Sequence, residues 1–596
     1  MATAEELRHR YITNTALPYV PDSSPTTKTP VFVAGSNVWT REEGYFERRP
    51  GFPTYTTNTF TGSVVRFFAW QRWNSDFYVM LNETVSTTTS TVYKLKVGTD
   101  TTFSAIHSDS TSAEPFDFVV SNNFVYFGNG VDMKKYDGTT TSNWGITAPA
   151  AAVTVTTTTG SLTTTRGYQW VICWENSSTG HVSSPSPVST LTTLTAQNAI
   201  LTGNTTTDSQ VDKTRIFRTL DGGSIFFQVA QINYSTWTAS GYTDSTTDTT
   251  LATAATIAPL QNQNNRPTAS KGPVWFANRI WTFDDDTLYY SNYEENVLGV
   301  EEESFASTNQ RSFGTEIFGL KVAGEYLLIF TASTIYRIYG DSLATFRMDT
   351  LGKKAGCRNR ACVAESGGIV GWLDSTNIVR ISDGVSITEV SKPIRSDIAS
   401  IVHASAAVAF FDDGTRHWLM LMDGGAGKIY VYDLDTDQWM PPWVVANITG
   451  MASGEIAAGT QRLFLGTTSK ALFLHTTSYL DNGVPFTASV TTSLFDLIDT
   501  DNPSEAGVID HLEVERNTAA ILSVKYLTDD DPATSSFTTF AGSAISPPRR
   551  TQGTNLVEVW YPQNGPNARR AAIQLNWTDA NLNFKVYGIA VACRGE

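Results

Sequence analysis

Cysteine, net positive charge and long apolar runs are all scarce in this chain. Four cysteines in 596 residues are too few to crosslink a protein of this size, so we expect buried free thiols and a reducing compartment. The chain has 42 basic and 58 acidic residues, which gives a formal charge of −16. This sign is wrong for a protein that binds the phosphate backbone of a nucleic acid tightly. The longest apolar runs, such as 325–330, are too short to cross a membrane, and residues 1–20 lack the apolar segment of an export signal. The composition therefore predicts a soluble chain without membrane insertion.

Threonine and aromatic residues are abundant instead. Threonine-rich stretches such as "TVTTTTGSLTTT" (154–165) alternate with runs of Val, Tyr, Phe and Trp, the residue types that suit a pleated sheet. Gly and Pro separate these runs and are typical of turns. We therefore expect an all-β fold.

A repeat of 43–49 residues runs through much of the chain. Each unit has an apolar strand, a short turn of Asp, Gly, Asn or Ser, and a second strand with aromatic residues. The units begin at Phe77, Phe124, Ile280, Tyr326, Ile369, Trp418 and Leu463. Five of the six intervals lie between 43 and 49 residues, but the second is 156 residues long. The long interval predicts a domain inserted into the array.

A period of about 40 to 50 residues built from short strands is typical of four-stranded propeller blades. A single blade cannot bury both faces of its sheet, so several must pack around one axis. The sequence therefore predicts a β-propeller of six or seven blades. A stack of sandwiches and a β-helix are the alternatives, but a β-helix needs much shorter repeats, and sandwiches would not keep one period across the insertion.

The composition between and beyond the repeats predicts the domain organisation. Residues 149–261 alternate strands with frequent turns, which indicates an inserted fibronectin-like β-sandwich. Residues 482–596 are strand-rich without the repeat and predict a C-terminal β-sandwich. The propeller then takes residues 61–148 and 262–481. Residues 1–60 form an N-terminal arm or, by donating a strand, close the propeller.

Three aspartates at alternate positions, Asp433, Asp435 and Asp437, raise the question of a calcium loop. A loop of the EF-hand type needs Gly at position 6 and Glu at position 12. Counted from Asp433, these positions hold Gln438 and Val444. The sequence therefore disfavours calcium.

The same place in other repeats also carries an aspartate between two strands, within 134–145 and 379–390. Aspartate caps such turns by accepting hydrogen bonds from its own backbone. We therefore expect Asp433 to form a turn, and Trp439 to begin the next strand and pack between blades.

The sequence contains no P-loop, dinucleotide fingerprint, paired-histidine zinc motif or nucleophile elbow. Histidines are dispersed over different repeats, as surface or strand residues, at His107, His181, His403, His417 and His475. Cys357 and Cys362 flank Arg358 and Arg360 in "GCRNRAC", but no second cysteine pair completes a zinc site, which favours a structural turn.

Acidic clusters lie at 283–287, 294–304 and 527–532. Two carboxylates at a suitable separation can hydrolyse a glycosidic bond, although surface loops of acidic proteins have the same composition. We favour surface loops. The sequence therefore predicts no enzyme activity, no catalytic, cofactor-binding or metal-binding residues, and no cofactor.

One set of stretches, taken in order, resembles a known family. The stretch "NVWTREEGYFERRPGF" (37–52) combines an Asn-led strand with an Arg-Pro-Gly turn. The others are 124–138, 214–229 followed by 242–248, 276–292, and 327–342 leading into 356–384. This order is similar to that of the tail-nozzle or stabilisation proteins of tailed bacteriophages.

The resemblance implies a virion structural protein rather than an enzyme. Proteins of this family form a homo-oligomeric ring, usually a hexamer, below the head-to-tail adaptor protein. Such a ring conducts or gates the DNA, which passes through the lumen without specific binding, and anchors tail fibres or spikes. The implied location is the virion tail, after synthesis in the host cytoplasm. Residues 1–60 would then close the propeller or dock on the adaptor.

Two other classes remain as alternatives. The first is a propeller binding module that recognises host carbohydrate or a partner protein, as a receptor-binding tail protein does. The second is a glycan hydrolase with acidic residues at the mouth of the propeller.

Overall fold

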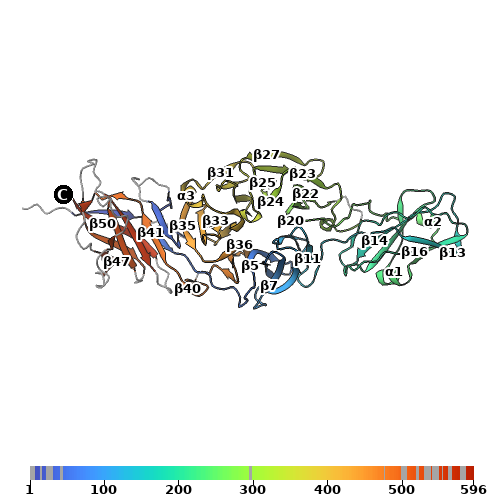
Figure 1. Cartoon of the computed structure of the whole chain (residues 1–596), viewed down its shortest axis with the longest axis horizontal. Helices are drawn as coiled ribbons and strands as arrows, with labels where there is room; N and C mark the ends of the chain where they lie inside the picture. The colour runs from blue at the N-terminus through green and yellow to red at the C-terminus, as the bar shows by residue number, and fades with distance from the viewer. Residues whose placement is uncertain are drawn as a thin grey trace, which may run out of the picture.

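The chain has three parts that lie in a row in a computed structural model (Figure 1). Strands from both ends of the chain form one end, a group of small sheets forms the middle, and the segment around β13, β14 and β16 forms the other end. The structure describes residues 7–13, 17–21, 31–40, 45–293, 298–475, 477–497, 507–517, 522–528, 538–539, 549–552, 555–560, 567–568, 570–577 and 585–595.

The middle part consists of small antiparallel sheets that resemble propeller blades, here numbered 1 to 7 in chain order. Sheet 1 contains β5 (Ser63–Gln71), β6 (Phe77–Val85), β7 (Thr89–Lys96) and β8 (Ser104–Asp109). Sheet 2 contains β9 (Asp117–Ser121), β10 (Phe124–Gly128), β11 (Met133–Tyr136) and β12 (Thr141–Asn143). Sheet 3 contains β20 (Lys271–Phe276), β21 (Arg279–Asp284), β22 (Thr287–Tyr290) and β23 (Gln310–Ser312).

The later sheets repeat this plan. Sheet 4 contains β24 (Ile317–Ala323), β25 (Tyr326–Thr331), β26 (Thr334–Tyr339) and β27 (Arg347–Lys353). Sheet 5 contains β28 (Val363–Ser366), β29 (Ile369–Leu373), β30 (Val379–Ser382) and β31 (Ile387–Glu389). Sheet 6 contains β32 (Ala406–Asp412), β33 (His417–Asp423), β34 (Lys428–Asp433) and β35 (Gln438–Val444). Sheet 7 contains β36 (Ile448–Ala457), β37 (Thr460–Thr467) and β38 (Ala471–Phe473).

The first strands of the seven sheets lie next to one another in cyclic order. β5 contacts β9, and the contacts continue through β20, β24, β28 and β32 to β36, which contacts β5 again. The middle strands are therefore covered on both faces, and β33 is buried from Trp418 to Asp423. Such double burial explains why these strands read as continuous apolar runs rather than alternating ones.

Sheet 7 has three strands, and a distant part of the chain lies beside its outer strand β38. Thr54 bridges to Leu472 and Gly51 to His475, both in antiparallel register. The backbone N–H of Tyr55 also donates to the carbonyl of Ala471 at 2.8 Å. Residues 51–55 therefore lie beside β38 and link the start of the ring of sheets to its end.

The segment between β12 and β20 forms two sheets around one core. One sheet contains β13 (Thr154–Leu162), β16 (Gln197–Thr202) and β19 (Tyr242–Asp244). The other contains β15 (His181–Val182), β14 (Trp170–Asn176), β17 (Lys213–Thr219) and β18 (Phe226–Asn233). Trp170 and Trp174 of one sheet and Leu162 and Leu201 of the other belong to a single hydrophobic cluster.

Strands from both ends of the chain form a second pair of sheets. One contains β1 (Leu7–Thr13), β3 (Val38–Trp39), β4 (Phe46–Arg48), β43 (Gly507–Arg516), β46 (Arg549–Gln552), β47 (Asn555–Trp560), β48 (Asn567–Ala568) and β50 (Lys585–Gly595). The other contains β2 (Phe32–Ser36), β41 (Ala488–Thr492), β42 (Phe495–Asp496), β44 (Leu522–Thr528), β45 (Thr538–Thr539) and β49 (Arg570–Trp577). This pairing of N-terminal with C-terminal strands was not predicted from the sequence.

Helices are short in the described part of the chain, so the protein is mostly rather than entirely β. They are α1 (Tyr234–Ser240), α2 (Asp248–Leu251) and α3 (Arg395–Ile398), with the single-turn helices η1 (Glu301–Glu303), η2 (Arg360–Cys362), η3 (Lys392–Ile394) and η4 (His403–Ser405). In the ranges given above, no helix has the length and apolarity to cross a membrane.

The buried guanidinium of Arg49 joins several distant segments. Its Nη1 and Nη2 atoms donate to the two carboxylate oxygens of Asp481, in the hairpin of β39 (Leu480–Asp481) and β40 (Val484–Pro485). Nε donates to Asn37 Oδ1 at 2.9 Å, and the backbone carbonyls of Pro50 and Val444 accept the remaining bonds at 2.9 Å. A bidentate pair with this many further bonds fixes position as well as charge. We call Arg49, Asn37 and Asp481 the clasp.

Aromatic rings and a close backbone contact complete the surroundings of the clasp. The Arg49 guanidinium lies 3.9 Å from the ring centre of Phe486 and 5.2 Å from that of Phe52. A side chain at Gly51 would place its Cβ 2.3 Å from the carbonyl oxygen of Leu480, so only glycine fits there. The clasp thus explains the Asn, Arg and Gly of the stretch 37–52.

Replacing Arg49 tests the clasp. Arg49→Met leaves the Asp481 carboxylate without its partner, and removing one partner of a buried ion pair costs about 3–5 kcal/mol. We expect the free energy of unfolding, measured by denaturant titration, to fall by about this amount. Arg311→Met, at an exposed position of β23, is the control and should change it by less than about 0.5 kcal/mol. Equal effects of the two changes would contradict the role of the clasp.

Candidate functional site

The aspartates singled out in the sequence form turns, as predicted. Asp433 Oδ1 accepts from the backbone N–H of Asp435 at 2.9 Å and of Thr436 at 3.3 Å. Asp137 and Asp383 accept from backbone N–H groups two and three residues later in the same way. The repeat of one aspartate turn across sheets 2, 5 and 6 is therefore structural.

Trp439 also lies where the sequence predicted. It is buried in β35 of sheet 6, and its Nε1 donates to the carbonyl of Val390, just beyond β31 of sheet 5, at 2.7 Å. The indole therefore joins two neighbouring sheets. This confirms the prediction that Trp439 packs between adjacent repeats.

The predicted acidic surface loops include two glutamates that are buried, so the prediction is wrong for them. Glu303 Oε1 lies 2.5 Å from the ammonium of Lys135, and both side chains are almost fully buried. Glu302 Oε1 accepts from the hydroxyl of Ser121 at 2.9 Å. Burial is tolerated because each carboxylate has a partner on sheet 2. The cluster 527–532 lies outside the described residues beyond Thr528.

The histidines lie on different elements and have different partners. His107 pairs with Asp132, His181 accepts from the N–H of Val300, His403 contacts the carbonyl of Asp374, His417 contacts Asp435, and His475 contacts Thr477. His181 is fully buried in the inserted segment, and this burial lowers its pKa to about 4. They do not converge on one site.

The four cysteines are free and buried, which confirms the prediction for them. In "GCRNRAC", the contact with Cys357 and burial together raise the pKa of the Cys362 thiol, so this thiol is not activated. The segment is a turn that contains η2, and the side chain of Asn359 accepts from the N–H of Ala361 at 3.0 Å to cap it. This turn directs Arg360 toward the centre of the ring of sheets.

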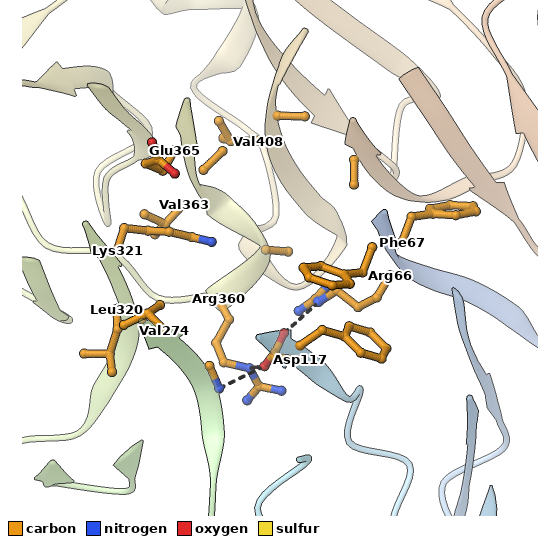
Figure 2. A pocket seen from close by; sticks show the side chains of 18 of the residues that line it. Arg66, Phe67, Asp117, Val274, Leu320, Lys321, Arg360, Val363, Glu365 and Val408 are labelled. Carbon is orange, nitrogen blue, oxygen red and sulfur yellow. Dashed lines mark hydrogen bonds and ion pairs between the residues drawn. The ribbon is translucent and has the colours of Figure 1, made fainter. Parts of the chain in front are cut away.

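Charged side chains from three parts of the ring meet at its centre (Figure 2). Arg66 of β5 donates from Nε to Asp117 Oδ1 at 3.2 Å, and Arg360 Nε lies 2.7 Å from Asp117 Oδ2. The N–H of Gly272 on β20 also donates to Oδ2 at 3.2 Å. Burial raises the pKa of Asp117, but the charges of Arg360 and Arg66 outweigh it and hold the pKa below its ordinary value. We call Arg66, Asp117 and Arg360 the central triad.

The triad separates two cavities on the axis of the ring. One has a volume of about 310 Å³ and the other about 400 Å³. Arg66, Arg360 and Ala361 line both. The two cavities therefore adjoin at Arg66 and Arg360 of the triad.

Arg66, Asp117 and the neighbouring Lys321 were not predicted from the sequence, because each predicted repeat begins at the second strand of its sheet. The starts at Phe77 and Phe124 fall at β6 and β10, so the strands nearest the axis were left outside the units. One signal was present: a single charge within an apolar strand, as in "SVVRFF" (63–68), "PFDFVV" (115–120) and "GLKVAG" (319–324).

No family model and no curated protein matches this chain. Among solved structures, Sqt1 of Chaetomium thermophilum is similar over 72 % of this chain and 97 % of its own, with 9 % identity and a TM-score of 0.29. Sqt1 of Saccharomyces cerevisiae covers 72 % and 98 %, with 8 % identity and a TM-score of 0.33. The Dos1 propeller covers 72 % and 95 %, with 11 % identity and a TM-score of 0.31. Likenesses at this level carry no argument about what this chain does.

Neutralising Asp117 tests the central triad. Asp117→Asn leaves two guanidinium groups close together without their shared carboxylate, and we expect a loss of about 3–5 kcal/mol in the free energy of unfolding at neutral pH. Because the pKa of Asp117 is lowered on folding, its contribution is complete above the unfolded value of about 3.9 and is lost as pH falls through the folded pKa.

The difference in stability between wild type and Asp117→Asn should therefore be constant from about pH 5 to 8 and shrink below about pH 4. Denaturant unfolding over a pH series measures this difference. Glu325→Gln, at an exposed hairpin turn, is the control and should show no such change. A difference that grows on acidification would contradict the ion-paired triad.

Proposed function

We propose that the seven blade-like sheets form a seven-bladed β-propeller, closed by residues 51–55 beside β38. In this architecture, residues 149–261 are an inserted β-sandwich. The C-terminal β-sandwich combines residues 482–596 with N-terminal strands β1 to β4. The cyclic contacts of the first strands and the shared cores of the paired sheets support this arrangement.

We further propose that the protein is a structural subunit of a ring-shaped bacteriophage tail nozzle, which lies below the head-to-tail adaptor, provides a passage for DNA and anchors tail appendages. The observation that carries the proposal is the structural role of residues 37–52, the first stretch that resembles the family. Asn37 and Arg49 of this stretch form the clasp with Asp481, in the hairpin that follows sheet 7, and Gly51 of the same stretch packs closely against Leu480.

The other resembling stretches also fall on structural landmarks. Residues 124–138 form the middle of sheet 2, 276–292 that of sheet 3, and 327–342 that of sheet 4. Residues 214–229 span two paired strands of the inserted segment, β17 and β18. The stretches therefore follow the plan of the fold, which supports a shared architecture.

The small size of the two central cavities bears on how such a subunit would conduct DNA. Cavities of about 310 and 400 Å³, separated by the ion-paired triad, are far too small for a duplex. A DNA passage would therefore lie between subunits, on the axis of the oligomer. The formal charge of −16 suits the lining of such a passage, because an acidic surface repels the phosphate backbone instead of binding it.

The oligomeric state of the purified full-length chain tests the proposal. We expect native mass spectrometry and electron microscopy to show a closed ring, usually of six subunits, alone or on the adaptor ring of the same virion. Reconstruction of that ring should place its lumen outside the axis of every propeller.

A chain that stays monomeric at micromolar concentration and does not bind the adaptor ring would contradict the nozzle function. Binding of the isolated subunit to host glycans on an array would then favour the receptor-binding alternative. Release of reducing sugar from host polysaccharide would favour the hydrolase.

A further inference from the structure

The cavity on one side of the central triad gathers more positive than negative side chains. Its volume is about 310 Å³, and the charged groups that line it are Arg66, Asp117, Lys321, Arg360 and Glu365. They come from β5, β9, β24, η2 and β28, so five elements around the ring contribute one charge each. Three cations face two carboxylates, and both oxygens of Asp117 are already used by the triad.

Lys321 has no partner of its own in this cavity. Among the described residues, no hydrogen bond or ion pair joins its ammonium to another group, although the side chain is partly buried and extends into the pocket (Figure 2). Glu365 of the next sheet lines the same cavity, and its carboxylate accepts from the N–H of Gly368 in its own hairpin at 3.1 Å. Burial lowers the pKa of Lys321, an effect that the charges of Asp117 and Glu365 partly oppose.

Arg66 also keeps free donors, and it enters the view of Figure 2 from the side opposite Lys321. It donates from Nε to Asp117 and from Nη1 to the carbonyl of Val65. In the part of the chain that the structure describes, nothing accepts from its Nη2. Lys321 and Arg66 therefore each have N–H donors that can bind a ligand in this cavity.

Irregular pairing in the first strands occurs close to these donors. The register of β5 against β6 shifts between Val64 and Arg66, and that of β24 against β25 shifts between Ile317 and Gly319. β20 has the same feature between Lys271 and Val274. Bulges of this kind re-aim side chains and are common beside binding sites.

We propose that this cavity binds a small oxyanion, a carboxylate or a phosphate, between Lys321 Nζ and Arg66 Nη2. A lysine ammonium and a guanidinium form strong, charge-assisted hydrogen bonds with such groups. The volume is roughly ten times the share of one water in the liquid, which is enough for inorganic phosphate or a four-carbon dicarboxylate with some waters. The site is independent of the nozzle function, because a single subunit contains all of it.

Isothermal titration of the full-length protein with inorganic phosphate and, separately, with succinate tests this site at constant ionic strength. We expect the wild type to bind at least one of them, and the preferred anion identifies the group that the cavity recognises. Lys321→Met should weaken binding by about 10- to 100-fold, the loss of one charge-assisted hydrogen bond. Lys321→Arg, which keeps the positive charge, should lose less anion affinity than Lys321→Met. Lys353→Met, at an exposed position of β27, is the matched control and should bind as the wild type does.

Thermal unfolding of the same variants separates a binding role from a structural one. Because the Lys321 ammonium has no partner in the cavity, Lys321→Met should not lower the melting temperature without ligand. Added anion should raise the melting temperature of the wild type and of Lys353→Met but not that of Lys321→Met. Absence of binding to the wild type, equal affinity in Lys321→Met, or a lower melting temperature of unliganded Lys321→Met would each overturn the proposal.

Discussion

The fold depends on one buried cation, the Arg49 guanidinium, and on the rule that a buried charge must have all its bonds made. Its donors are used by Asn37, Asp481 and two backbone carbonyls, and these acceptors come from two segments about 400 residues apart. A different register of residues 51–55 against β38 would leave the guanidinium or the carboxylate unpaired, at a cost of several kcal/mol. The clasp therefore sets how the ring of sheets closes and where the two chain ends meet.

The same principle holds at two other places where distant segments meet. The carboxylate of Asp117 joins sheets 1 and 2 to η2, and the pair of Lys135 with Glu303 joins sheet 2 to the loop before β23. Each of these charges has its partner within the protein. Lys321 differs, because it lines a cavity in which no hydrogen bond or ion pair joins its ammonium to another described residue. Asp117, Lys135 and Glu303 are paired and therefore have structural roles. The unpaired ammonium of Lys321 is instead available to a ligand.

The regular features could be predicted from sequence because they depend on local patterns. The period of the repeats, the aspartate turns and the contact of Trp439 each follow from neighbouring residues. The central triad could not, because Arg66, Asp117 and Arg360 are far apart in the chain and each looks like an isolated charge. The burial of Glu302 and Glu303 was equally hidden, since their partners Ser121 and Lys135 lie about 170 to 180 residues earlier. Contacts that depend on closure of the ring leave no local pattern to detect.

The pairing of β1 and β4 with β50 also determines when their shared sheet can form during synthesis. β1 and β4 are synthesised well before β50, the strand with which both pair. Residues 51–55 likewise can pair only after β38 has been synthesised. An unfinished polypeptide therefore exposes unpaired strand edges throughout its synthesis, and such edges readily join other chains. Synthesis of β50 therefore supplies the partner that covers the edges of β1 and β4 and takes them away from other nascent copies.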